Sequence, residues 1–122
     1  MIALALALML DAAPAAAVPA DIGPQPTMEE YIALAEPALD AKRKGRRPVT
    51  YEWPYRLVAG SAGYYTCGRV DRAKTKGRGS EGIWVSARVA QGRVVDAQWS
   101  TMNGMLAWLC KREIKKGTLV AR

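Results

Sequence analysis

Apolar positions recur along this chain with two different periods, one typical of helices and one typical of strands. Between residues 28 and 39 they return every three or four positions, which predicts a helix with one buried face. The residues of this face are Met28, Tyr31, Ile32, Ala35, Ala38 and Leu39. Thr27 and Glu30 have the spacing of a capping box, so the helix is expected to begin here. Pro37 predicts a kink or two short helices, the second ending at Gly45.

From Val49 the period changes to two, which predicts β-strands. Pro54 interrupts the first alternating run, and the gap Gln91-Gly92 suits a tight hairpin between the last two runs. The predicted strands cover 49–53 with 55–58, 64–70, 83–89 and 93–99. We therefore expect three or four antiparallel strands.

A helical pattern returns near Asn103, and Gly117 stands where this last helix is expected to end. Its buried face is expected to carry Met102, Met105, Leu106, Leu109 and Cys110. A helix, a group of strands and a second helix in this order predict an α+β domain. We expect a small antiparallel sheet of three to four strands, with an N-terminal helix and a C-terminal helix packed on one face.

The first part of the chain has the pattern of a secretory signal peptide. Ile2 to Leu10 is an unbroken apolar run, and it is too short for a membrane span, which needs about 20 residues. Small residues at Ala15–Ala17 and Val18–Ala20 offer cleavage positions. No Lys or Arg precedes the run, and the alternative is an apolar N-terminal helix that stays in the protein. Removal of residues 1–20 predicts a periplasmic or secreted protein whose mature chain has no transmembrane span.

Charge divides the rest of the chain into two parts. The protein has 18 basic and 11 acidic residues, a formal net charge of +7, and every basic residue lies after position 41. We expect a linker and an acidic helix over 21–47, ending in the basic junction 42–47, and a disulfide-bonded α+β domain over 48–122. The acidic segment either lies over the basic remainder or forms a separate flexible arm.

The composition excludes several chemistries. A chain without histidine has no His general base and no His-ligated metal, and two cysteines are too few for a four-thiolate zinc site. A glycosidase would need two carboxylates facing each other across a cleft, and the spacing of those available gives no sign of this. They are Glu52, Asp71, Glu81, Asp96 and Glu113. Ser61 lies in a glycine-bearing turn without a nucleophile-elbow motif, which leaves only Ser-Lys chemistry open. We expect no enzymatic activity, no catalytic residue, no metal and no cofactor.

Two cysteines, Cys67 in a predicted strand and Cys110 on the last helix, are the candidates for a disulfide bond. Export would place both in an oxidising compartment, so we predict that they are bonded to each other. The bond would close a loop of 43 residues and contribute about 4 kcal/mol in the chain-entropy model. The alternative is two separate buried thiols. A redox-active pair is disfavoured because such pairs usually form a Cys-x-x-Cys turn.

Arg72, Lys74, Lys76 and Arg78 alternate with small residues and form the most specific pattern in the chain. In an extended backbone these cations lie on one side, about 6.6 Å apart, and this spacing predicts salt-dependent contact with a polyanion. The alternative is a solvated hairpin loop that charge keeps soluble. The last helix carries a further basic cluster of Lys111, Arg112, Lys115 and Lys116.

The aromatic residues of the chain are four Trp and five Tyr, and it contains no Phe. The tightest groups are Trp53-Pro54-Tyr55 and Tyr64-Tyr65. Such residues either form a stacking platform for sugars or bases, or fill a small core with their polar tips at the surface.

The segment Tyr65-Thr66-Cys67-Gly68-Arg69-Val70-Asp71 resembles the Cys-Gly-x-Val-Asn segment of small uncharacterised exported proteins of proteobacteria. The resemblance covers residues 64–89. Asp71 stands in place of the Asn, and a Lys/Arg-rich loop replaces a neutral Gly-Gly-Tyr-Thr-Gly turn. Because that family has no established activity, the resemblance implies export and a folded domain.

These features predict an exported, basic, non-enzymatic bacterial protein that binds anionic surfaces of the envelope, such as lipid headgroups or polysaccharide. Arg72, Lys74, Lys76 and Arg78 are the predicted contacts, and nucleic acid ranks below the envelope polyanions. The alternative is an inhibitor or accessory protein that binds a protein partner through its Trp/Tyr surface, with the basic loop steering the encounter. A third class is a purely structural envelope protein.

Overall fold

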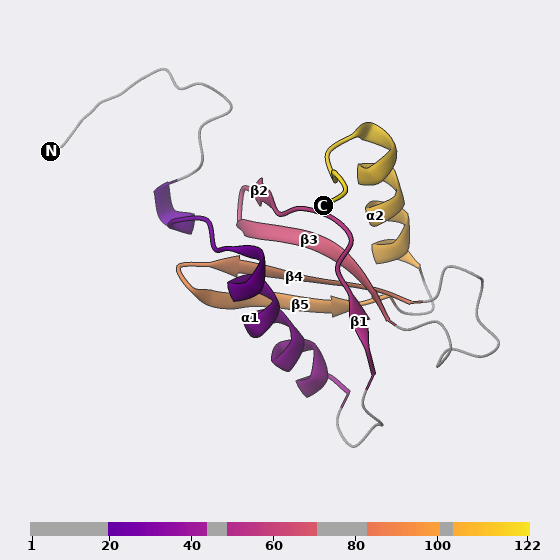
Figure 1. The fold of residues 1–122 in the computed structure, drawn as a ribbon, viewed down its shortest axis with the longest axis horizontal. Coiled ribbons are helices and arrows are strands. Elements are labelled where there is room, and N and C mark those ends of the chain that lie inside the picture. The colour runs from indigo at the N-terminus through magenta and orange to yellow at the C-terminus, as the bar shows by residue number, and fades with distance from the viewer. Residues whose placement is uncertain (1–19, 44–48, 71–82, 101–103) are drawn as a thin grey trace, which may run out of the picture.

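The structure is a computed structural model that describes residues 20–43, 49–70, 83–100 and 104–122. The predicted signal peptide therefore lies outside the described residues, except for Ala20. The elements are a short 3-10 helix η1 (Ala20–Ile22), α1 (Met28–Ala41), β1 (Tyr51–Glu52), β2 (Val58–Gly60), β3 (Gly63–Val70), β4 (Trp84–Ala90), β5 (Arg93–Trp99) and α2 (Met105–Lys116). The α+β class, with an N-terminal and a C-terminal helix flanking an antiparallel sheet, is confirmed (Figure 1).

The sheet has five strands rather than three or four, in the order β1-β3-β4-β5 with β2 also paired to β3. The difference arises at Pro54, which separates the runs 49–53 and 55–58. The sequence leaves open whether these runs form one strand or two, and the structure has two, β1 and β2. Both runs pair with the long strand β3 at different points, since Tyr51 faces Val70 and Val58 faces Tyr65. One long strand thus aligns two short ones.

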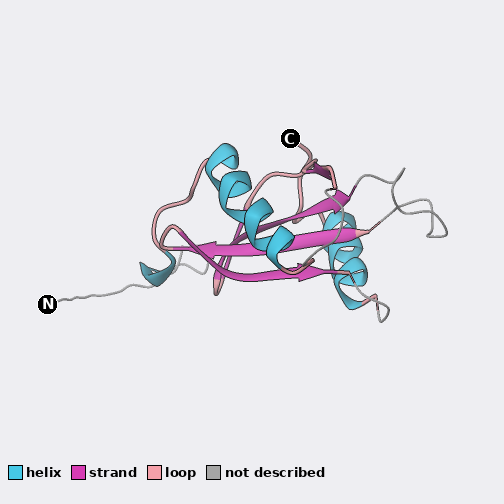
Figure 2. Ribbon diagram, turned by 90° about the horizontal axis from the view of Figure 1, so that it is seen from below, coloured by secondary structure: helices cyan, strands magenta, loops and turns pink. Residues whose placement is uncertain are grey.

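The two helices cover opposite faces of the sheet, so the prediction that both pack on one face was wrong. Alternate residues of β4 point to opposite faces. Val85, Ala87 and Val89 share a core with α1, whereas Trp84 shares a second core with Cys110 of α2. Because β4 is apolar on both faces at this point, each face needs its own cover. Figure 2 shows α1 lying along the sheet and α2 near one end of the strands.

The acidic helix α1 lies over the sheet and is part of the same core, which decides against a separate flexible arm. Its capping box forms as predicted: the Glu30 amide donates to Thr27 Oγ1 at 3.1 Å and the Thr27 amide donates to Glu30 Oε1 at 2.8 Å. Pro37 lies inside one continuous helix, on its exposed side. The helix therefore does not divide into two short ones.

Polar groups of α1 also bind the sheet. Tyr51 donates its hydroxyl to Asp40 Oδ1 at 2.6 Å, and the Trp53 indole donates to Glu36 Oε2 at 2.9 Å. The fully buried Tyr31 hydroxyl donates to the Ala87 carbonyl at 2.7 Å and accepts from the Ala87 amide at 3.1 Å. A single α1 hydroxyl thus satisfies both backbone groups of one β4 residue.

The segment 21–26, expected as a linker, docks against the hairpin that joins β4 to β5. Gln91 donates its backbone amide to the Ile22 carbonyl at 3.0 Å and its side-chain amide to the Asp21 carbonyl at 2.6 Å. The predicted tight hairpin is present, and Gln91 and Gly92 both have positive φ, of 55° and 73°. Two consecutive residues of this kind are the signature of a type I′ turn, whose twist matches that of the strands.

A bulge interrupts the pairing of β4 with β5. Val89 pairs with Val94 and Arg88 pairs with Asp96, so Val95 has no partner across the ladder. Val95 is 57% exposed. The bulge therefore turns one apolar residue of the edge strand β5 towards solvent.

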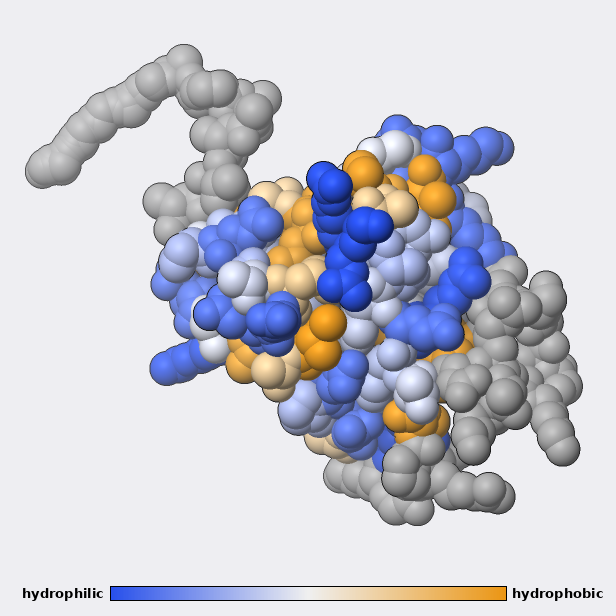
Figure 3. Space-filling model, in the orientation of Figure 1, coloured by the Kyte–Doolittle hydropathy of each residue, from blue (hydrophilic) through white to orange (hydrophobic). Residues whose placement is uncertain are grey.

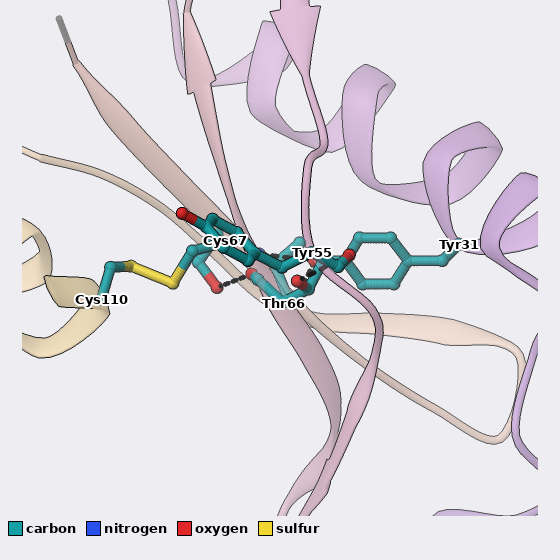
Figure 4. The surroundings of a disulfide bond; sticks show 7 residues. Tyr31, Tyr55, Thr66, Cys67 and Cys110 are labelled. Atoms are coloured by element: carbon teal, nitrogen blue, oxygen red, sulfur yellow. Dashed lines mark hydrogen bonds between the residues drawn. A yellow bond between two sulfur atoms is a disulfide. The ribbon is translucent and has the colours of Figure 1, made fainter. Parts of the chain in front are cut away.

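The predicted disulfide bond between Cys67 and Cys110 is confirmed, with a Cα–Cα distance of 6.1 Å. It joins β3 to α2, and both cysteines are buried with Trp84 and Leu119. In Figure 4, Tyr31 reaches β3 from one side and Cys110 reaches it from the other. The disulfide therefore fixes the second layer of the protein to the sheet.

Cys110 also sets the rotation of α2 about its own axis. Leu106 and Ile114, four positions before and after it, pack in the same core. Met105 and Leu109 were expected on this buried face, but they are 57% and 39% exposed. That part of the prediction was wrong for Met105, because two apolar stripes run along α2 and the one containing Cys110 faces the sheet. Leu109 lies at the margin between the two stripes and lines a depression against the sheet with Cys110.

Gly68 is required by close packing rather than by backbone conformation. A Cβ atom at this position would lie 2.6 Å from Trp53 Cε3 and 2.8 Å from the Glu52 carbonyl oxygen. We expect Gly68→Ala to lower the free energy of unfolding by about 1–3 kcal/mol, since overpacking displaces the neighbours. Urea denaturation measures the loss. The control is Ala59→Ser at an exposed position of β2, which should stay within about 0.5 kcal/mol of wild type. Equal midpoints for all three proteins would contradict the prediction.

A candidate anion-contact surface on the last helix

The predicted anion-binding residues Arg72, Lys74, Lys76 and Arg78 lie outside the described residues. Of the basic junction 42–47, Lys42 and Arg43 are described and lie at the end of α1. Arg43 stacks over Trp99, with 5.2 Å between its guanidinium carbon and the ring centroid. The basic cluster of the last helix lies entirely within α2, in the layer on the other side of the sheet.

The outward side of α2 combines apolar and basic side chains. Met105, Trp108 and Leu109 are spaced by three and four positions, which places them on one side of a helix. Leu109 lies at the margin of this side, since it is 39% exposed and also lines the depression between α2 and the sheet. Trp108 is 56% exposed, the only one of the four Trp residues among the exposed large hydrophobic side chains. Arg112 and Lys116 continue the same side towards the end of α2. In Figure 3, hydrophilic and apolar residues lie side by side over the α2 end of the molecule.

A shallow hollow of about 360 Å³ lies on this side of α2. It is lined by Trp108, Lys111, Arg112, Lys115 and Lys116, four cations and one aromatic ring. The Arg112 guanidinium lies over the Trp108 ring, 5.3 Å from its centroid. Glu113 is the one carboxylate of α2; it approaches Lys116 at 3.9 Å and lines a different depression. The hollow is therefore a positively charged depression with an aromatic wall. We call it the α2 hollow.

Opposite charge lies on the other layer of the protein. Helix α1 carries Glu29, Glu30, Glu36 and Asp40 and no basic residue. Since α1 and α2 cover opposite faces of the sheet, the two helices give the protein an acidic side and a basic side. A charged surface would orient a molecule with this distribution before contact.

A second, larger depression lies where α2 leaves part of the sheet uncovered. It has a volume of about 400 Å³ and is lined by side chains of both positive and negative charge. Its charged and phenolic residues are Tyr65, Arg88, Asp96 and Glu113. The fold thus brings together Asp96 and Glu113, two carboxylates whose sequence spacing gave no sign of proximity.

The charges of this depression have partners within the protein. Asp96 faces Arg88 across the strand pair and accepts a hydrogen bond from Gln98 Nε2 at 2.7 Å. Burial raises the pKa of the Tyr65 hydroxyl, and the Glu113 carboxylate raises it further while Arg88 opposes the shift. Ser61 also lines the depression, at the turn between β2 and β3. This mutual compensation of charge gives the depression no net preference for an anion.

Most aromatic residues belong to the core. Trp53 and Tyr64 are 5% and 2% exposed, and the rings of Trp53 and Tyr31 form a T-shaped pair with centroids 5.5 Å apart. Trp84 is buried beneath the Arg69 guanidinium, which lies 4.4 Å from its ring centroid. These positions favour the packing interpretation of the aromatic residues over a stacking platform. The exceptions are Trp108, which is exposed, and Tyr65, which lines the depression beside the sheet.

Within the part of the chain that the structure describes, neither helix is long and apolar enough to cross a membrane. Across the same residues, His, Cys, Asp and Glu side chains form no group of three or more that could hold a metal ion. No protein-family model matches the chain, and no curated protein or solved structure matches it either.

Proposed function

We propose that this protein is an exported, non-enzymatic basic domain that contacts an anionic surface of the bacterial envelope. The observation that carries the proposal is the α2 hollow, in which four cations surround one exposed Trp. Lys and Arg side chains attract anionic surfaces, and among the residues that the structure describes no carboxylate lines the hollow. The disulfide bond supports an oxidising compartment, periplasmic or extracellular.

The alternative, binding of a protein partner through a Trp/Tyr surface, has less support. It requires several exposed aromatic rings, and Trp53, Tyr64 and Trp84 are buried. The basic loop residues Arg72, Lys74, Lys76 and Arg78 remain proposed as additional contacts to the same anionic surface.

The triple variant R112Q/K115Q/K116Q tests the role of α2. Each Lys or Arg near an anionic surface contributes about 1 kcal/mol, so we expect binding to anionic vesicles at low salt to weaken by about 100-fold. The salt concentration at which the variant elutes from heparin should also be lower than for wild type, because fewer counterions are released on binding. Co-sedimentation and heparin chromatography measure these two effects.

The matched control is K42Q/R56Q/R93Q, which removes the same charge at exposed positions outside α2. We expect it to retain most of the wild-type affinity. If the control loses as much affinity as the α2 variant, the contact follows net charge alone and the proposal is wrong. A loop variant, R72S/K74S/K76S/R78S, measures the contribution of the loop in the same assays.

A further inference from the structure

We propose that the anionic surface is a lipid bilayer, and that Met105, Trp108 and Leu109 enter its interfacial region while the α2 cations bind phosphate groups. This inference rests on the proposed function, which leaves the source of the anionic groups open. It assigns the apolar residues of α2 a role that electrostatic contact alone does not require.

The first argument is the clustering of exposed apolar side chains. The described residues contain five exposed large hydrophobic side chains, and three of them, Met105, Trp108 and Leu109, lie within five consecutive positions of α2. They are 57%, 56% and 39% exposed. A hydrated polysaccharide would leave these side chains largely in water. A bilayer interface would remove them from water, which is favourable for each.

The second argument is the order of residue types along α2. The apolar residues occupy the first half of its outward side, and the cations Arg112, Lys115 and Lys116 occupy the second half. Trp prefers the boundary between headgroups and acyl chains, and Lys extends an apolar stem with a charged tip. Arg112 stacks on the Trp108 ring, and a stacked guanidinium still directs donors at its edge towards a phosphate. Apolar insertion and phosphate binding therefore occur on one continuous surface.

The third argument is the position of the negative charge. The carboxylates of α1 lie on the opposite face of the sheet, so a molecule that rests on α2 holds them away from anionic lipid. The α2 carboxylate, Glu113, is turned towards the sheet depression, and its side chain is 21% exposed. Repulsion from these groups is therefore small in this orientation.

A second copy of the chain is a poorer occupant of the same surface. Two α2 surfaces would repel each other through their cations. The acidic α1 of another copy would complement the charge, but its exposed positions offer no large apolar side chain to Trp108. They are Glu29, Glu30, Ala33, Pro37, Asp40 and Ala41. The bilayer satisfies both the charge and the apolar surface.

Two variants, Trp108→Ala and M105S/L109S, separate insertion from charge attraction. We expect each to bind vesicles of phosphatidylglycerol and phosphatidylcholine about tenfold more weakly than wild type, because less apolar surface is transferred. Retention on heparin should be unchanged. The matched control is Val120→Ser, which alters a side chain that is 49% exposed and lies outside α2. It should bind vesicles like wild type. Brominated lipid should quench wild-type fluorescence more than that of Trp108→Phe.

The outcomes distinguish the two proposals. If wild type binds neither heparin nor anionic vesicles, the proposed function fails. If both apolar variants bind vesicles like wild type and brominated lipid does not quench Trp108, contact is electrostatic only and this inference alone is overturned. Self-association that M105S/L109S abolishes, without vesicle binding, would also overturn it in favour of a second copy.

Discussion

The variant C67A/C110A is expected to lose about 4 kcal/mol of its free energy of unfolding. The bond closes a loop of 43 residues, so its removal lets the unfolded chain explore many more conformations. This loss is large against the total stability of a whole domain, which is typically about 5–15 kcal/mol. Urea denaturation of the oxidised wild type and the variant measures it.

Reduction of the wild type provides the control for this prediction. Dithiothreitol should lower the wild-type midpoint towards that of C67A/C110A and leave the variant unchanged. Amide exchange should increase most in α2, because Cys110 is the only buried residue of this helix. Equal stability of the oxidised wild type and the variant would contradict the assigned role of the disulfide.

Alkaline pH is expected to destabilise the protein through Tyr31. Burial raises the pKa of Tyr31 from 10.0 to about 12, with the hydrogen bond to Ala87 partly opposing the shift. Below pH 10 both the folded and the unfolded states keep the proton. Between these two values the unfolded chain releases the proton while the folded protein retains it, so stability falls as pH rises. The full interval corresponds to a loss of about 3 kcal/mol.

Tyr31→Phe isolates this effect from the other titrating groups. Burial, followed by its hydrogen bond to Asp40, also raises the pKa of Tyr51, so both proteins keep that contribution. The variant should be less stable at neutral pH, since the Ala87 amide loses its partner. Its stability should nevertheless fall less steeply with alkaline pH than that of wild type. Parallel curves from urea denaturation at several pH values would rule out Tyr31 as the responsible group.

The local parts of the fold were predictable because their signals lie within a few residues. The capping box of Thr27 and Glu30, the Gln91-Gly92 hairpin and the helix end at Gly117 all form as expected. The disulfide was also predictable, since two cysteines allow one intramolecular pairing. The first three inferences need only residue types and short spacings, and the disulfide, which joins positions 43 residues apart, needs only the number of cysteines.

The assignment of faces was not predictable from spacing. Alternation in β4 separates Trp84 from Val85, but it does not say which helix covers which side. For α2, the stripe Met105–Leu109 and the stripe Leu106–Cys110 are both apolar, and the structure buries the second one, where Cys110 bonds to Cys67 and Leu106 packs beside it. The exposed Trp108 follows from that rotation. The sequence does show the four cations of α2, but it does not show that they line one hollow with an aromatic ring.

The unpaired Val95 bears on how these molecules meet one another at high concentration. Strand β5 is an edge strand of the described sheet, and a regular edge strand is a template with which a strand of a neighbouring chain can pair. The bulge at Val95 bends β5 and increases its local twist, so the outer edge of this strand is not regular. A bulged edge strand is a poorer template for a continuous intermolecular sheet, which favours separate molecules at high concentration.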